Sequence, residues 1–158
     1  MPSGDPGARP LTRDDVDLFD AARVLLEQRH HPSLHQVVAA VRGESGAIYT
    51  GLHLGSRRVN VCAESSAIAA AVIAGEERIV AAVAVCMGTG ADATVPQVTN
   101  PCGVCRELMG EYGADAKILV DDGGVVRAAE LRELLPLPWL RAEELEVAPA
   151  APTTEHTP

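Results

Sequence analysis

The chain has 158 residues and a formal net charge of −9, with 13 Lys and Arg residues against 22 Asp and Glu. This length suits one domain with its own hydrophobic core. Because nucleic acids are bound mainly through Lys and Arg, the acidic balance argues against a nucleic-acid partner and favours a small diffusible one. We expect the domain to occupy residues 12–142, between disordered tails at 1–11 and 143–158.

Nothing in the apolar pattern indicates a membrane protein. The longest apolar runs, near 67–74 and 79–86, are too short to cross a bilayer, and Met1–Pro10 has no apolar signal segment. We therefore expect a cytoplasmic protein without a membrane partner. The four cysteines should then stay reduced, so they are interpreted as metal ligands or core residues rather than as disulfides.

Apolar periodicity and turn residues predict an alternation of helices and strands. In chain order these are a helix at 12–29, strands at 35–41 and 47–54, a helix at 62–73, a strand at 78–85, a helix at 102–112, strands at 117–120 and 125–128, and a short helix at 130–135. This order predicts an α/β fold, in which a mixed five-stranded sheet carries helices on both faces.

The first predicted helix and the loop before the helix at 102–112 carry more specific signals. The first helix opens with a weak capping box formed by Thr12 and Asp15. Its buried face is predicted from the helical spacing of four apolar residues: Val16, Phe19, Ala22 and Leu26. Ahead of the helix at 102–112, a long loop is predicted because turn-forming residues interrupt the chain, namely Gly88, Gly90 and Pro96.

Two cysteine motifs lie where predicted helices begin. The first is Cys62-Ala63-Glu64, and the second is Pro101-Cys102-Gly103-Val104-Cys105. The thiols of the second motif are three residues apart, so they share one helix face. With Cys62 they would make a three-ligand zinc set, and a catalytic zinc keeps its fourth position open for water. A helix N-terminus also favours the thiolate form that binds metal.

The charge around such a site has to be offset. Three thiolates around Zn²⁺ leave a formal charge of −1, which makes a bound water less acidic. Arg106, next to Cys105, and the two helix N-termini are available to compensate. Glu64 follows the first thiol by two residues, close enough to handle protons without being a ligand. This combination of thiols and carboxylate is typical of zinc deaminases.

The two motifs together resemble the free-nucleoside cytidine deaminase family, including blasticidin S deaminases. The resemblance is carried by Cys-Ala-Glu at 62–64 and Pro-Cys-Gly-Val-Cys-Arg at 101–106, and the order of elements is similar over about 12–139. The stretch Arg132–Pro136 also looks like the C-terminal part of that family. Each motif alone is a weak signal, whereas their combination is specific.

This resemblance implies a three-layer α-β-α sandwich, with zinc bound by Cys62, Cys102 and Cys105. It implies hydrolytic removal of the amine of a cytosine-like nucleoside or base as ammonia. Glu64 would take a proton from water, deliver it to the ring nitrogen and then assist the leaving ammonia. The family resemblance also implies a homotetramer, with a homodimer as the smaller option, in which neighbouring subunits complete the active sites.

One departure from the family bears on the substrate. Members usually carry an Asn and a Glu two residues apart at the end of the second strand, which hold the ribose, whereas residues 51–56 here read Gly-Leu-His-Leu-Gly-Ser. We expect His53 to take the position of the Asn, and Gly55 to leave extra room. Losing a polar pair built for a hydroxyl costs discrimination. A modified or antibiotic cytosine nucleoside is therefore a second hypothesis for the substrate.

Two further residues are expected to contact the substrate. Ala63 lies between the first thiol and the candidate proton carrier. Trp139 offers a flat surface for a planar base, and we expect it to reach into the site of a neighbouring subunit.

Three other interpretations of the cysteines stay open at this point. Cys102 and Cys105 would make a redox pair if Cys62 and Glu64 were coincidental. A purely structural zinc site would recruit Cys86 as its fourth ligand, although Cys86 is better interpreted as a core residue. A zinc-stabilised binding protein of the same fold would have no use for Glu64.

Overall fold

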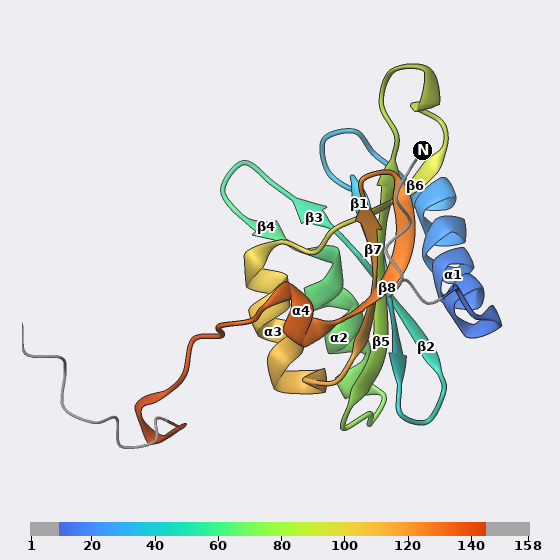
Figure 1. Ribbon diagram of the computed structural model, residues 1–158. Helices are drawn as coiled ribbons and strands as arrows, with labels where there is room; N and C mark the ends of the chain where they lie inside the picture. Colours follow the sequence, from blue (N-terminus) through green and yellow to red (C-terminus); the bar gives the residue numbers. More distant parts are fainter. Residues whose placement is uncertain (1–9, 145–158) are drawn as a thin grey trace, which may run out of the picture.

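The computed structural model describes residues 10–144, and a mixed sheet with the strand order β2-β1-β5-β7-β8 runs through its centre (Figure 1). Its strands are β1 (Val37–Gly43), β2 (Ile48–Leu52), β5 (Ile79–Met87), β7 (Lys117–Asp122) and β8 (Val125–Glu130). Only β5 and β7 are parallel neighbours, and the other pairs along this path are antiparallel. The predicted mixed five-stranded sheet is confirmed.

Helices cover both faces of the sheet and give three layers (Figure 1). One face carries α1 (Arg13–Arg29). The other carries α2 (Ala63–Ile73), α3 (Gly103–Gly113) and the short α4 (Leu131–Leu134). The three-layer α-β-α sandwich implied by the family resemblance is therefore confirmed.

The hydrophobic core is double because the central strands are buried on both faces. Successive residues of a strand point to opposite faces, so β1 sends Val38 towards α1 and Ala39 towards α2. Leu18, Ala22 and Leu26 of α1 fill the first core. Alanines of α2 share the second core with Cys105 and Met109 of α3. The alanines of α2, together with those of β1 and β5 that face it, let this helix lie close to the sheet.

The buried face of α1 differs from the one that its apolar spacing predicted. Leu18 is fully buried together with Ala22 and Leu26, whereas Val16 is 41% exposed and Phe19 is half-buried. The predicted face was thus partly wrong. The reason is Asp15, which is only 2% exposed and occupies the first turn of the buried face. A charged residue with a partner there could not be expected from helical periodicity alone.

Two short segments also depart from the expected pattern. The loop predicted after β5 contains a 3-10 turn, η1 (Gly90–Asp92), and a strand, β6 (Pro96–Thr99), which pairs antiparallel with β5. Proline is tolerated there because it is the first residue of the strand. The strand predicted at 47–54 is interrupted at His53, and the chain continues as a separate ribbon of β3 (Leu54–Gly55) and β4 (Asn60–Val61).

The two ends of the domain can be compared with the prediction only in part. After α4 the chain runs away from the sheet (Figure 1) and includes a 3-10 turn, η2 (Ala142–Glu144). The predicted tails fall almost wholly on residues 1–9 and 145–158, which lie outside the described residues, so their disorder stays a prediction. Among residues 10–144, no helix combines the length and the apolar character needed to cross a bilayer.

Asp15 ties the start of α1 to the sheet. Its carboxylate accepts hydrogen bonds from the backbone and hydroxyl of Thr12, at 2.8 Å each, which confirms the predicted capping box. It also pairs with Lys117 Nζ of β7 at 2.7 Å. Burial alone would raise the pKa of Asp15, but the bonds from Lys117 and Thr12 outweigh it and hold that pKa below the ordinary value.

We predict that Asp15→Asn lowers the free energy of unfolding by about 2 kcal/mol near neutral pH, because it weakens a buried charge-assisted pair. The pKa of Asp15 is lower in the folded than in the unfolded state. Its contribution is therefore present above the unfolded pKa and lost as pH falls through the folded pKa. Denaturant unfolding should show the difference from wild type shrinking in acid.

Asp17→Asn is the matched control for this experiment. Asp17 lies on the same helix and pairs with Arg13 at 2.9 Å, but both side chains are exposed to solvent. Removing such a pair should change stability little. Equal losses for the two variants would contradict a special role for the buried pair.

Candidate metal centre

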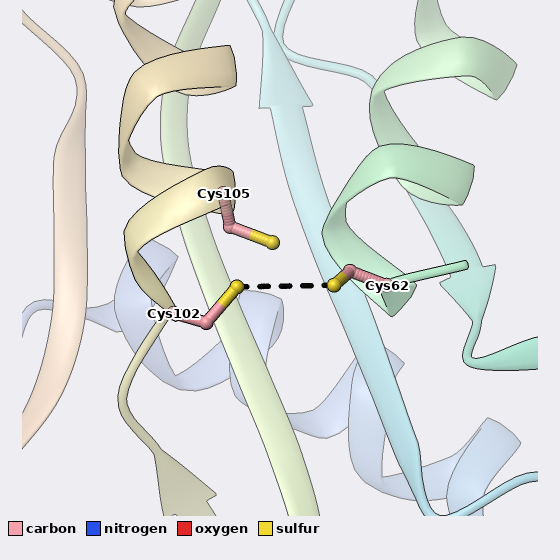
Figure 2. A group of neighbouring side chains, drawn as sticks. All are labelled: Cys62, Cys102 and Cys105. Carbon is pink, nitrogen blue, oxygen red and sulfur yellow. Dashed lines mark hydrogen bonds between the residues drawn. The ribbon is translucent and has the colours of Figure 1, made fainter. Parts of the chain in front are cut away.

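Two helices that begin on the same face of the sheet bring three thiols together (Figure 2). Cys62 is the N-cap residue of α2, and Cys102 is the N-cap residue of α3. Cys105 lies in the first turn of α3 and is fully buried. In Figure 2 the side chains from the two helices point towards one another. The predicted convergence of the two cysteine motifs is thus found in the fold.

The spacing of the sulfur atoms suits zinc. The three Sγ atoms lie within 4.8 Å of one another, and those of Cys62 and Cys102 are 3.8 Å apart. A tetrahedral zinc with Zn–S bonds of about 2.3 Å places its sulfur ligands about 3.8 Å apart. Among the described residues, Cys86 on β5 does not belong to this group of potential ligands. A four-cysteine structural site with Cys86 therefore has no support in the geometry.

The thiols differ in how readily they ionise without metal. Burial raises the pKa of Cys62 and, much more strongly, that of Cys105. Burial also acts to raise the pKa of Cys102, but the nearby backbone N–H of Cys105 and the two neighbouring thiols lower that pKa overall. Of the three thiols, Cys102 therefore has the most favourable setting for a thiolate.

Glu64 lies beside the thiols in the first turn of α2 and is only 5% exposed. Its charge contributes to raising the pKa of Cys62 and Cys105 and opposes the lowering at Cys102, as expected of a carboxylate close to all three sulfurs. Among residues 10–144, its side chain makes no hydrogen bond or ion pair to another residue. Within residues 10–144 no buried side-chain oxygen lacks a hydrogen-bond partner, so the unpaired oxygens of Glu64 reach solvent, as a group that exchanges protons with water requires.

The first turn of α2 is held against β2 by an unusually close approach of two backbones. A Cβ added at Gly51 would lie 2.1 Å from the backbone N of Ala67 and 2.4 Å from the carbonyl oxygen of Ala63, so only glycine fits. Next to it, Ser66 Oγ donates to the carbonyl of Leu52 at 3.0 Å. These contacts seat the helix that carries Cys62 and Glu64. Sequence analysis did not single out Gly51, although a glycine inside a predicted strand is a known sign of close approach.

Two of the expected substrate contacts lie in or next to α2, since the carbonyl of Leu52, the residue before His53, accepts from Ser66 of that helix. Ala63 is the first residue of α2 and is almost fully buried. His53 follows β2 directly, and its Nδ1 accepts a long hydrogen bond of 3.4 Å from the backbone N–H of Gln36. The ring is therefore anchored at Nδ1, and within residues 10–144 its Nε2 has no hydrogen-bond partner.

The other two expected residues occupy different surroundings. The guanidinium of Arg106 donates to the carbonyl oxygens of Pro101, at 2.9 Å, and Leu134, at 3.0 Å, so it joins α3 to α4. Trp139 is 73% exposed, and its backbone N–H donates to Glu107 of α3 at 3.3 Å. Glu107 is two residues beyond Cys105, on the opposite side of the helix. Within one chain, Trp139 is thus separated from the thiols by α3.

A mixed sheet between helix layers, with three thiols at zinc spacing beside a carboxylate, defines a zinc-dependent hydrolase site of the deaminase type. The family model described as the cytidine and deoxycytidylate deaminase zinc-binding region matches residues 12–120. The chain therefore belongs to the cytidine and deoxycytidylate deaminase family, and it is a hydrolytic deaminase with Zn²⁺ as its cofactor.

Individual relatives agree with this assignment. The chain is 32% identical to a blasticidin-S deaminase from Bacillus cereus over 135 residues, which cover 83% of this chain and 96% of that protein. The crystal structure of cytidine deaminase from Mycobacterium leprae is similar with a TM-score of 0.64 and 27% identity, over 77% of this chain and 97% of that one. The cytidine deaminase from Bacillus anthracis gives a TM-score of 0.67 and 26% identity, over 78% and 88%.

We predict that Cys102→Ser reduces the zinc bound per chain, because a hydroxyl replaces an exposed thiolate that packs against little else. Cys86→Ser should retain full zinc, since Cys86 lies outside the group. Metal analysis of both purified proteins after dialysis tests this prediction. Zinc retained by the first variant and lost from the second would overturn the ligand set.

Proposed function

We propose that Cys62, Cys102 and Cys105 bind the zinc, and that Glu64 moves protons while a cytosine-type nucleoside is hydrolysed to its uracil-type product. One observation carries this proposal: three sulfur atoms at zinc spacing lie beside a mostly buried glutamate, whose carboxylate reaches solvent and has no protein partner among the described residues. A redox pair would require neither the third thiol nor the carboxylate. The enzyme interpretation uses all four groups.

When bound, zinc supplies a Lewis acid that makes water a nucleophile near neutral pH. Glu64 accepts one proton from the attacking water and gives it to the ring nitrogen of the base. It then passes the remaining water proton to the exocyclic amine, which leaves as ammonia. The same carboxylate thus acts as base and as acid, and its place in the first turn of α2 keeps it close to both transfers.

The substrate is proposed from what surrounds this centre. His53 offers Nε2 where the chain leaves β2, while Gly51 and Gly55 supply no side chain for a ribose hydroxyl. The expectation that Gly55 leaves extra room is wrong, because a Cβ added there would lie 2.9 Å from the carbonyl oxygen of Ser33, which fills that space. Recognition of the sugar is therefore expected to rest on His53 rather than on a polar pair.

A modified cytosine nucleoside is the second candidate substrate, because the relative from Bacillus cereus is a blasticidin-S deaminase. Ammonia release from cytidine, deoxycytidine, cytosine and blasticidin S distinguishes the two. Turnover of cytidine would support an ordinary nucleoside deaminase. Activity confined to blasticidin S would support the antibiotic substrate. No ammonia from a wide panel of amines, with zinc bound, would contradict both.

We predict that Glu64→Gln keeps its zinc but lowers the rate of ammonia release by at least about a hundredfold, because the amide cannot carry protons. Glu76→Gln is the matched control. Glu76 is also a buried glutamate, but its carboxylate is bound by Ser45 and by the hydroxyl of Tyr49 at 2.9 Å. This control should lose stability and keep its rate, and full activity of Glu64→Gln would refute the mechanism.

The chain is also proposed to assemble as a homotetramer, or at least as a homodimer, in the cytoplasm. Free thiols need a reducing compartment to stay available for metal. Large apolar side chains are exposed on α2, on α3 and after α4, including Ile73, Val104 and Leu137. Trp139 belongs to the last of these segments and would then complete the site of a neighbouring subunit.

Sedimentation of the purified protein should therefore give a mass of two or four chains, because burying these exposed apolar side chains favours association. Trp139→Ala should weaken substrate binding without removing zinc if the residue serves a neighbouring site. A monomer with full activity would contradict both the assembly and the shared site.

A further inference from the structure

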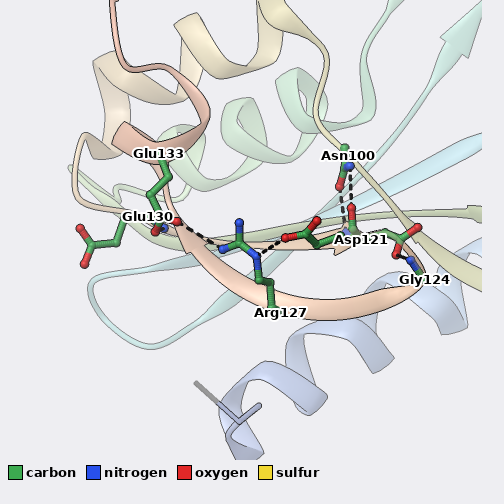
Figure 3. A network of polar contacts seen from close by, with 7 residues as sticks. Asn100, Asp121, Gly124, Arg127, Glu130 and Glu133 are labelled. Atoms are coloured by element: carbon green, nitrogen blue, oxygen red, sulfur yellow. Dashed lines mark hydrogen bonds and ion pairs between the residues drawn. The ribbon is translucent and has the colours of Figure 1, made fainter. Parts of the chain in front are cut away.

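Asn100 links the metal-binding loop to the sheet by its side chain. It immediately precedes the Pro101-Cys102 motif. Its Nδ2 donates to the carbonyl oxygen of Asp121 at 2.9 Å, and its Oδ1 accepts from the backbone N–H of Asp121 at 2.9 Å (Figure 3). The carboxamide therefore pairs with β7 as a peptide group of a neighbouring strand would.

This link lies at the point where the backbone leaves the sheet. The parallel pairing of β5 with β7 is confined to Ala81 and Ala82. Further along, β5 pairs instead with β6, whose last residue, Thr99, lies opposite Ala84. Within residues 10–144, no backbone ladder joins β6 to β7. The side chain of Asn100 supplies that connection directly before the chain turns towards α3.

The position of the Cys102 sulfur is set by the backbone of its loop more than that of the Cys105 sulfur is. Cys105 is fully buried among core residues, whereas Cys102 is exposed and so has few neighbours to fix its sulfur. From the α3 side, the loop is held by Arg106, whose guanidinium donates to the carbonyl of Pro101 and whose backbone N–H donates to that of Cys102. From the sheet side it is held by Asn100. Each end of the loop thus has one anchor.

We propose that Asn100 is a positioning residue that sets Cys102 for metal binding, an inference that rests on the proposed assignment of Cys102 as a zinc ligand. Without the carboxamide, the loop gains freedom on the sheet side and the exposed thiol leaves its position near Cys62. Groups that hold metal ligands in place typically change metal affinity by about ten- to a hundredfold. Asn100→Ala should weaken zinc binding by such a factor.

Asp121→Ala is the matched control. The side chain of Asp121 accepts a hydrogen bond from the backbone N–H of Gly124 at 2.7 Å, so its loss destabilises the same end of β7. Both bonds of Asn100 go to the backbone of Asp121 and persist in this variant. The two variants therefore share a loss of local stability, and only Asn100→Ala disconnects the metal loop.

Zinc affinity is measured by competition with a chelator, and the absorption of the Co²⁺-substituted protein reports thiolate ligation independently of activity. We expect Asn100→Ala to bind zinc about ten- to a hundredfold more weakly and to alter the cobalt spectrum, with Asp121→Ala close to wild type. Equal weakening in both variants, or wild-type affinity in Asn100→Ala, would overturn the inference.

A second variant covers the case in which Asn100→Ala fails to fold. Asn100→Asp keeps an acceptor for the N–H of Asp121 but loses the donor to its carbonyl, so an intermediate loss of affinity is expected. Wild-type affinity in Asn100→Asp would then count against the inference. Failure of the ligand assignment is recognised separately, because Cys102→Ser would then bind zinc as tightly as wild type.

Discussion

Cys62, Glu64, Cys102 and Cys105 crowd four groups that ionise to anions into one small volume, and this crowding costs free energy that the fold has to offset. Burial is the main cause of the raised pKa values of Cys62 and Cys105, and the nearby charges of Glu64 and the neighbouring thiols raise them further. The two helix N-termini lower that cost, since their free N–H groups and partial positive charge face the thiols. Zinc is the remaining compensation, which explains why a site of this kind suits a metal enzyme.

This constraint accounts for how the surrounding elements are built. The two helices must start close together, so α2 is seated on β2 through Gly51, and α3 is reached from β6 through a loop with an anchor at each end. Arg106 follows Cys105 in the sequence. Its guanidinium donates to two carbonyl oxygens and forms no ion pair among the described residues. These two bonds hold the start of α3 against the end of α4.

Local chemistry could be predicted from the sequence, and non-local pairing could not. The capping box of Thr12 and Asp15 and the paired spacing of Cys102 and Cys105 involve neighbours along the chain, and both were recognised. The strand β6 was missed because Gly88, Gly90 and Pro96 are turn signals, whereas its pairing partner lies on β5. The buried face of α1 was misjudged because Lys117, far along the chain, makes burial of Asp15 possible.

The contact at Gly51 has a consequence for how the protein opens. Because the backbone of β2 touches that of α2, neither can separate from the sheet without disturbing the other. Hydrogen exchange should therefore find Cys62 and the segment before His53 in one cooperative unit of local unfolding. Cys102 and Cys105 lie at the start of α3, which packs against β5, α4 and α2. A ligand set drawn from both segments would couple the opening of α3 more tightly to that unit.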